Sequence, residues 1–275
     1  MAKIDLWFPA LLGVNALYLA SAALFLANFA TSRDTKRLAN SALYAGFFLA
    51  SALIFYESRV LGIYVPVASL AQALFFFSWS MVLIYLLLAW KVRLDTFGVI
   101  LMPLILLMSG SALVVGGGDV AMRPYFASPW FAIHVSCAFL AYASFALSFV
   151  GALLYLVQNR ELKAKQASTF YHKLPSLEAL ETTVYGTIML GFPLLTAGLV
   201  SGFFWTGEVF GRLWQWEPKF ILSIATWLIY LAILYAHYVR DFRGKKVVLV
   251  SILAFGFVLF TFLGVNYFEA GVHNF

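Results

Sequence analysis

Cysteine is almost absent from this sequence of 275 residues, since Cys137 is the only one. A single thiol within an apolar stretch excludes an internal disulfide, a CxxC redox pair and a thiolate metal cluster. Charged residues are also scarce, at 11%, and the sequence contains no Walker A loop, GxSxG elbow or HExxH motif. The chain therefore has no self-contained catalytic motif, and its participation in an enzymatic reaction is an open question.

Apolar residues dominate the composition: 63% of the chain is hydrophobic and its mean hydropathy is +0.91. A soluble domain of this length does not bury so much apolar surface, so lipid is the expected solvent. Backbone groups in hydrocarbon must be paired within the segment, which predicts an all-α fold, a polytopic integral membrane helix bundle forming a single domain over 1–275. Eight apolar runs are long enough to span a bilayer: 6–29, 39–57, 66–90, 97–115, 130–157, 183–205, 220–239 and 247–266.

The basic residues predict the orientation of these eight transmembrane helices. Thirteen of the 18 Lys and Arg residues follow the odd-numbered runs, and the other five lie on the opposite side. Basic residues are retained on the cytoplasmic side, so we expect both termini outside. Because the charges follow the ends of the runs, they indicate topology and not a nucleic-acid partner. The stretch GRLWQWEPKF (211–220) then faces outside, and it overlaps a tryptophan-rich external loop over 205–219.

Three of the four histidines are placed where an imidazole can have a function, and the two outer ones, His134 and His273, suggest axial ligation of a haem iron. His134 lies near the outer end of the fifth run and His273 in the outer tail, while His237 lies near the inner end of the seventh. The fourth, His172, lies in a polar insert at roughly 158–182. An unpartnered imidazole is costly in a membrane, which makes His134 and His237 functional candidates. Imidazole binds iron well, and a porphyrin favours flat aromatic contacts.

Other residues on the outer side suit the same ligand. Arg123, Arg212 and Lys219 are basic groups able to pair with haem propionates. A stripe of small residues lets a flat ligand, or another helix, approach the fifth run: Cys137, Ala138, Ala141, Ser144 and Ser148. Two plainer interpretations stay open at this point. Trp214 and Trp216 are also typical of a membrane-interface belt, and small-residue stripes are typical of helix packing.

Six segments resemble one family of haem-handling membrane proteins. GRLWQWEPK resembles the tryptophan-rich WWD signature of the CcsA/ResC cytochrome c synthesis proteins and of the related HemX proteins. Five further segments are similar to parts of that family in the same order: 64–79, 134–156, 175–205, 225–240 and 263–275. The resemblance covers most of the chain. It departs from the family pattern at Gln72, where an acid is usual, at Glu217, where aspartate is usual, and at Phe220, where glutamate is frequent.

The resemblance implies a set of haem-binding residues. His134 and His273 match external histidines that are axial ligands of haem iron, and His237 matches a ligand of a haem held within the membrane. Three tryptophans would lie against the external haem: Trp205, Trp214 and Trp216. The implied cofactor is non-covalent haem b. The implied partners are apocytochrome c and a CcsB/ResB-like membrane protein, which supplies the second intramembrane ligand.

The function expected from this resemblance is export or presentation of haem at the outer face for cytochrome c assembly. The implied location is the bacterial inner (cytoplasmic) membrane, with the tryptophan-rich loop on the external, periplasmic side. One alternative is a HemX-type protein that regulates haem biosynthesis through the level of glutamyl-tRNA reductase, with haem as signal. Another is a small-molecule transporter, although the sequence has neither paired intramembrane charges nor an obvious inverted repeat.

Overall fold

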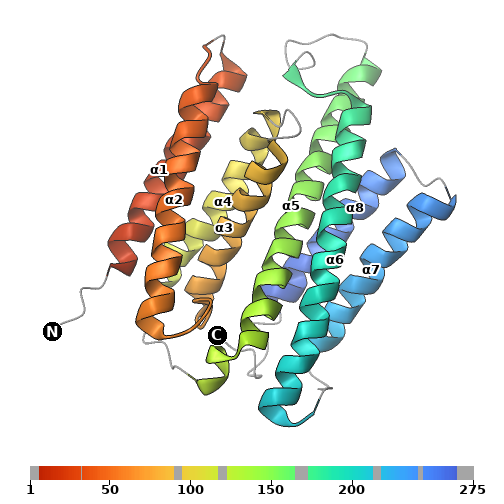
Figure 1. Ribbon diagram of the computed structural model, residues 1–275. Coiled ribbons are helices and arrows are strands. Elements are labelled where there is room, and N and C mark those ends of the chain that lie inside the picture. The colour runs from red at the N-terminus through yellow and green to blue at the C-terminus, as the bar shows by residue number, and fades with distance from the viewer. Residues whose placement is uncertain are drawn as a thin grey trace. The chain divides into compact units, whose positions relative to one another are not determined.

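The computed structural model describes residues 6–31, 33–89, 95–116, 123–164, 173–212, 218–240 and 244–264. Throughout these ranges the regular elements are helical and there is no strand, so the predicted all-α fold is confirmed (Figure 1). The helices are α1 (Trp7–Ala30), α2 (Lys36–Leu61), α3 (Leu70–Ala89), α4 (Asp95–Val115), η1 (Pro124–Ala127), α5 (Pro129–Ala164), α6 (Leu177–Phe210), α7 (Pro218–Arg240), α8 (Lys245–Leu259) and η3 (Phe260–Gly264). Eight candidate membrane spans result, as predicted.

Two helices extend well beyond the apolar runs that predicted them. The fifth run ends at 157, but α5 continues to Ala164, and the sixth run starts at 183, whereas α6 begins at Leu177. Ser176 caps α6, since its hydroxyl accepts the Ala179 N–H at 3.2 Å. The extra turns are polar but contain good helix formers, so a hydropathy criterion ends too early at both places. Much of the polar insert at 158–182 is therefore helix and not loop.

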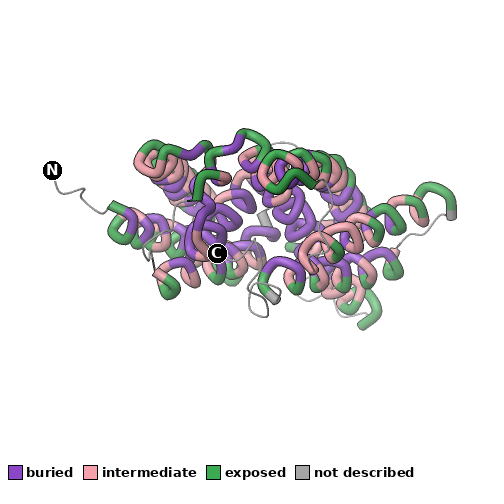
Figure 2. Tube along the Cα trace, turned by 90° about the horizontal axis from the view of Figure 1, so that it is seen from below, coloured by how far each residue is buried: buried purple, intermediate pink, exposed green. Residues whose placement is uncertain are grey.

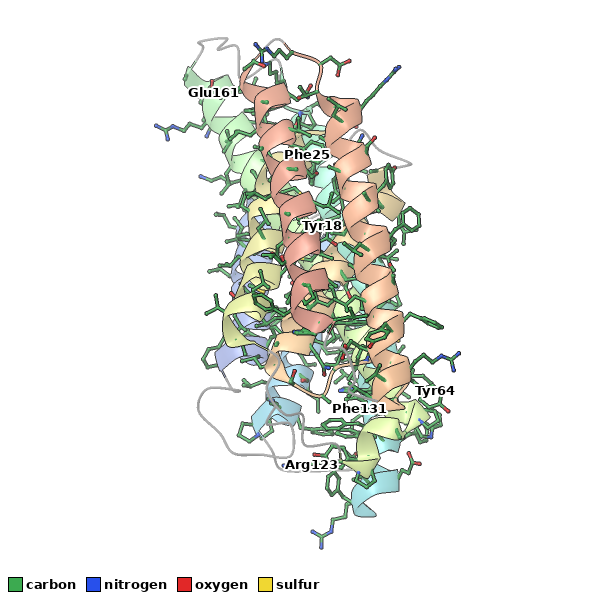
Figure 3. All side chains as sticks on the ribbon, turned by 90° about the vertical axis from the view of Figure 1, so that its left-hand side faces the viewer. Tyr18, Phe25, Tyr64, Arg123, Phe131 and Glu161 are labelled. Carbon is green, nitrogen blue, oxygen red and sulfur yellow. The ribbon has the colours of Figure 1, made fainter. Side chains whose placement is uncertain are left out.

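The chain divides into two compact units, Met1–Ala132 and Ile133–Phe275, here called unit 1 and unit 2. In unit 1, α1 packs against α2 and α4 where glycines face its large aromatic residues. A Cβ on Gly46 would come within 2.7 Å of the Tyr18 ring, and one on Gly98 within 3.0 Å of the Phe25 ring. Figure 3 shows Tyr18 and Phe25 at successive levels of this unit, and both are buried. Glycine thus allows close helix contact, as is common in membrane bundles.

Two part-buried polar contacts join the helices of unit 1. The Ser109 hydroxyl of α4 donates to Asn15 Oδ1 of α1 at 2.9 Å. The Trp79 indole N–H of α3 donates to the Ser51 hydroxyl of α2 at 2.8 Å. Such bonds satisfy polar groups for which hydrocarbon offers no partner.

The start of α3 explains one departure from the family pattern. Gln72 Oε1 accepts the Ala68 N–H at 2.9 Å, and the Ser69 hydroxyl accepts the Gln72 N–H at 3.2 Å. These are the contacts of a capping arrangement, in which a side-chain oxygen satisfies an otherwise orphaned N–H. Gln72 therefore keeps the hydrogen-bond acceptor that an acid at this position would also provide.

In unit 2, α5 and α6 meet along a glycine seam, defined here by Gly191, Gly198 and Gly202 of α6. A Cβ on Gly191 would lie 2.6 Å from Phe145 Cε1, and one on Gly198 would lie 3.3 Å from Ala138 N. A Cβ on Gly202 would lie 2.7 Å from His134 Nδ1. As the residue numbers of the glycines on α6 rise, the residue numbers of their partners on α5 fall, so the two helices run antiparallel. The seam brings the start of α5 beside the end of α6.

Helices α7 and α8 complete unit 2 through aromatic and polar contacts. The Trp227 indole N–H of α7 donates to Thr196 Oγ1 of α6 at 2.9 Å. The Tyr230 ring of α7 stacks on Phe145 of α5, with centroids 3.5 Å apart. The Gly244 N–H, at the start of α8, donates to Glu181 Oε1 of α6 at 2.8 Å.

The distribution of exposed residues agrees with a lipid environment. Along α1 the buried face contains Leu11, Val14, Tyr18, Ser21 and Phe25, and the exposed face contains Phe8, Leu12, Leu19 and Leu26. Figure 2 shows buried and exposed positions alternating around the helices in the same manner. A helix whose exposed face is as apolar as its buried face belongs in hydrocarbon. The chain is a multi-pass membrane protein; the outward placement of its termini stays a prediction.

Candidate functional site

The candidate site lies at the end of unit 2 where α5 begins, α6 ends and α7 begins. The Ser128 hydroxyl accepts the Trp130 N–H at 3.2 Å, and Pro129 occupies the first position of α5. Proline is favoured there because a first-turn N–H has no partner within the helix. His134 follows in the next turn, so its side chain projects from α5 close to the helix end.

The imidazole of His134 is held by the backbone of α6. Its Nδ1 lies 2.7 Å from the carbonyl oxygen of Gly198. A carbonyl oxygen only accepts hydrogen bonds, so Nδ1 carries the proton, and in the neutral ring Nε2 then carries the lone pair. Metal-binding histidines usually have one nitrogen that donates to a fixed acceptor, as Nδ1 does here, while the other nitrogen is the metal ligand.

Trp205 lies beside this histidine and not in a loop. It belongs to the last turns of α6, which continues to Phe210, and only 1% of the residue is exposed. Its ring plane is within 11° of the His134 ring, with centroids 6.1 Å apart. The buried indole is therefore part of the surroundings of the imidazole. The predicted contact between Trp205 and haem stays a prediction.

The connection from α6 to α7 begins at Gly211 and ends at Pro218. Gly211 has φ +66°, a left-handed conformation that favours glycine, and its N–H bonds to the Gly207 carbonyl at 3.0 Å. Pro218 is the first residue of α7. Phe220, a departure from the family pattern, packs edge-on against Phe203 of α6, with ring centroids 5.0 Å apart. This contact joins the two helices that flank the loop.

The structure describes only some of the remaining predicted residues of the outer side. Arg212 is exposed just after α6, and Lys219 lies half-buried in the first turn of α7. Trp214, Trp216 and Glu217 lie outside the described residues, as do His172 and His273.

Arg123 belongs to unit 1. There its guanidinium donates to the Tyr125 hydroxyl at 2.9 Å and lies over the Tyr125 ring, 5.8 Å from the centroid. Figure 3 shows Arg123 near the same end of unit 1 as Tyr64. Its pairing with a propionate stays a prediction, as it does for Arg212 and Lys219.

His237 lies at the opposite end of unit 2, near the end of α7. Its ring contacts Tyr185 of α6, with centroids 3.5 Å apart and planes at 30°. Its Nδ1 is buried and has no hydrogen-bond partner among the described residues. A buried polar atom without a partner is costly and requires an explanation, such as a ligand. His134 and His237 therefore do not form one site; each has its own surroundings.

Sequence reasoning missed the residues of α6 that surround His134. Two residues of the small-residue stripe on α5, Ala138 and Ala141, lie against the glycine seam of α6, which is the helix-packing alternative. The signal was present in the spacing of Gly191, Gly198 and Gly202, which places three glycines on one helix face. Their register against His134 is a tertiary property.

Among the described residues, no group of three or more His, Cys, Asp or Glu side chains is placed to hold a bare metal ion. A haem iron does not require such a group, because the porphyrin supplies the equatorial nitrogens and the protein needs to supply only axial ligands. Single imidazoles such as His134 and His237 are of the kind that haem uses.

These features define the class: an all-helical, multi-pass membrane protein with an oriented imidazole and a buried indole at one end of a four-helix unit. Comparison with known families gives its particular membership. The family described as cytochrome C assembly protein matches residues 67–273. The chain belongs to this family, which confirms the resemblance seen in the sequence.

Individual relatives are similar over most of their length. The chain is 28% identical over 243 residues to the cytochrome c biogenesis protein CcsA of Trieres chinensis, covering 77% of this chain and 78% of the relative. It is 29% identical over 231 residues to CcsA of Guillardia theta, with 77% of each covered. CcsA of Microcystis aeruginosa is 27% identical over 260 residues, with 77% of this chain and 79% of the relative covered.

Proposed function

We propose that this protein binds haem and presents it at the outer face of a bacterial cytoplasmic membrane for cytochrome c assembly. The observation that carries the proposal is the 2.7 Å contact between His134 Nδ1 and the Gly198 carbonyl. It leaves Nε2 as the nitrogen with the lone pair that an iron ligand needs. His134 lies at a helix end that adjoins the tryptophan-rich loop, where a flat apolar cargo would find aromatic surface.

The residues of this chain suit haem as a cargo. Haem b has an apolar ring, an iron that takes imidazole, and anionic propionates; when bound non-covalently it offers vinyl groups for attachment to apocytochrome c thiols. His134 and His273 would hold the iron at the outer face, and Arg212 and Lys219 would pair with propionates. Trp205 would orient His134, and Trp214 and Trp216 would cover the ring.

His237 has a second part in the proposal. Its buried Nδ1, which has no hydrogen-bond partner in the part of the chain that the structure describes, fits a histidine that awaits a ligand inside the membrane. We assign it to hold haem within the bilayer before the cargo reaches His134. The second intramembrane ligand would come from a CcsB/ResB-like partner protein, because iron in a low-spin site takes two axial ligands.

The test is the absorption spectrum of the full-length protein, purified after expression with ample haem and with its CcsB/ResB-like partner. We expect a low-spin, bis-histidine haem spectrum. Replacement of His134 or His273 by Ala should abolish the outer-face component, and His237→Ala should remove the intramembrane component. His172→Ala is the matched control, since this histidine has no assigned part, and its spectrum should equal that of the parent. Purification of the parent without haem under these conditions would refute the proposal.

A further inference from the structure

We propose that two features of α6, the carbonyl of Gly198 and the missing side chain of Gly202, are positioning elements that lock the His134 imidazole in its Nδ1–H tautomer. The consequence is that His134 presents only Nε2 as a ligand atom. The haem part of this inference rests on the proposed function. The tautomer is a property of the protein without haem and is tested separately.

The carbonyl of Gly198 determines which nitrogen of His134 carries the proton. Gly198 O is 2.7 Å from His134 Nδ1 and also accepts the Ser201 hydroxyl at 3.0 Å. A carbonyl oxygen has no proton to give, so a ring with the proton on Nε2 would place two lone pairs against each other at this distance. Reversal of the tautomer therefore loses a part-buried hydrogen bond and adds a repulsion.

The missing side chain of Gly202 provides the space for so short a contact. A Cβ on Gly202 would lie 2.7 Å from Nδ1, 3.0 Å from Cε1 and 3.5 Å from Cγ of His134. The ring thus occupies the volume of the missing methyl group, and any other residue at 202 would push it off α6. Trp205, buried and nearly parallel to the ring, lies beside it one turn further along α6.

The fixed position of the His134 ring affects how its other nitrogen binds a metal. A histidine that donates from one nitrogen to a fixed acceptor becomes a stronger donor to metal through the other nitrogen, and its ring orientation is fixed. Gly198 and Gly202 touch the ring and not the iron, so they are positioning residues. Helix α6 would determine both which nitrogen of His134 faces the cargo and how strongly it binds.

The tautomer of His134 and the role of Gly202 are tested by heteronuclear NMR of full-length, haem-free protein with isotopically labelled histidine nitrogens. His134→Ala assigns the signals. In the parent we expect His134 to be neutral with the proton on Nδ1, and in Gly202→Ala we expect loss of that single form. A parent spectrum with the proton on Nε2 overturns the proposal, and this reading does not depend on whether Gly202→Ala folds.

Two glycines of the same helix are controls. A Cβ on Gly186 meets nothing within 4 Å, and one on Gly191 strikes Phe145 but not His134. Gly186→Ala and Gly191→Ala should both leave the His134 tautomer unchanged. If Gly191→Ala changes the tautomer as Gly202→Ala does, the effect is general disruption of the seam, and the positioning claim is wrong.

Haem titration of the same variants separates this inference from the proposed function. Gly202→Ala should weaken haem binding by about 10- to 100-fold, the usual effect of losing an outer-shell partner. Gly186→Ala should match the parent. If the parent shows the Nδ1–H form but binds no haem, the proposed function fails and the positioning stands. If haem binds through His134 equally well in Gly202→Ala, the proposed function stands and the positioning fails.

Discussion

A single methyl group should have different effects on stability at two glycines of α6, one within the glycine seam and one outside it. At Gly191 the new Cβ would lie 2.6 Å from Cε1 and 2.9 Å from Cδ1 of Phe145, and 3.1 Å from the Ala141 carbonyl oxygen. Phe145 has no room to retreat, because it is fully buried and its ring stacks on Tyr230 at 3.5 Å. At Gly186 a Cβ meets nothing within 4 Å.

The magnitudes follow from two competing terms. Alanine is favoured over glycine in a helix by about 1 kcal/mol, and both variants gain this amount. Overpacking a tight contact costs about 1–3 kcal/mol, and only the Gly191 variant has this cost. We therefore expect Gly186→Ala to be more stable than the parent by about 1 kcal/mol. Gly191→Ala should be less stable than Gly186→Ala by about 1–3 kcal/mol.

The free energy of unfolding is measured by reversible titration of the purified protein from mild detergent into SDS, with helix content as the signal. The parent and both variants are compared in the same micelle composition. A Gly191→Ala protein as stable as Gly186→Ala would show that α5 and α6 do not meet at the distance described here, and the seam would have to be abandoned.

Two further predictions concern charge and buried polarity. Replacing Arg212 and Lys219 by Gln should lower haem retention and its salt sensitivity without changing the type of spectrum. The control is Lys246→Gln, at the other end of unit 2, which should have no effect. Equal haem retention in all variants would contradict propionate pairing. In unit 1, a double-mutant cycle of Asn15→Ala and Ser109→Ala should give a coupling of about 0.6–1.7 kcal/mol in the free energy of unfolding, the range for hydrogen bonds between membrane helices. Strict additivity would mean that the two side chains do not bond.

Much of the architecture was predictable because the membrane restricts the solutions. Eight long apolar runs in a chain with little charge leave helices as the only way to pair the backbone. The errors occurred where helices leave the hydrocarbon. The polar turns of α5 after 157 and of α6 before 183 are set by capping and helix propensity, for example at Ser176, and hydropathy does not detect them.

The candidate site was only partly predictable. His134 and His237 could be selected from the sequence, because an imidazole in an apolar run is costly unless it has a partner. Trp205 was assigned to a loop, whereas it is buried within α6 beside His134. The sequence does not single out the glycines that surround His134. Glycine is common in membrane helices, and its role depends on which residue faces it.

The sequence by itself determined that this protein lies in a membrane, that it is helical, and which imidazoles are available, because hydropathy and residue type are properties of the chain alone. Only the tertiary structure decided which nitrogen of His134 carries the lone pair. That choice depends on the Gly198 carbonyl, 64 residues away. The two groups meet because α5 and α6 pack antiparallel in one register, with Gly202 leaving room for the ring.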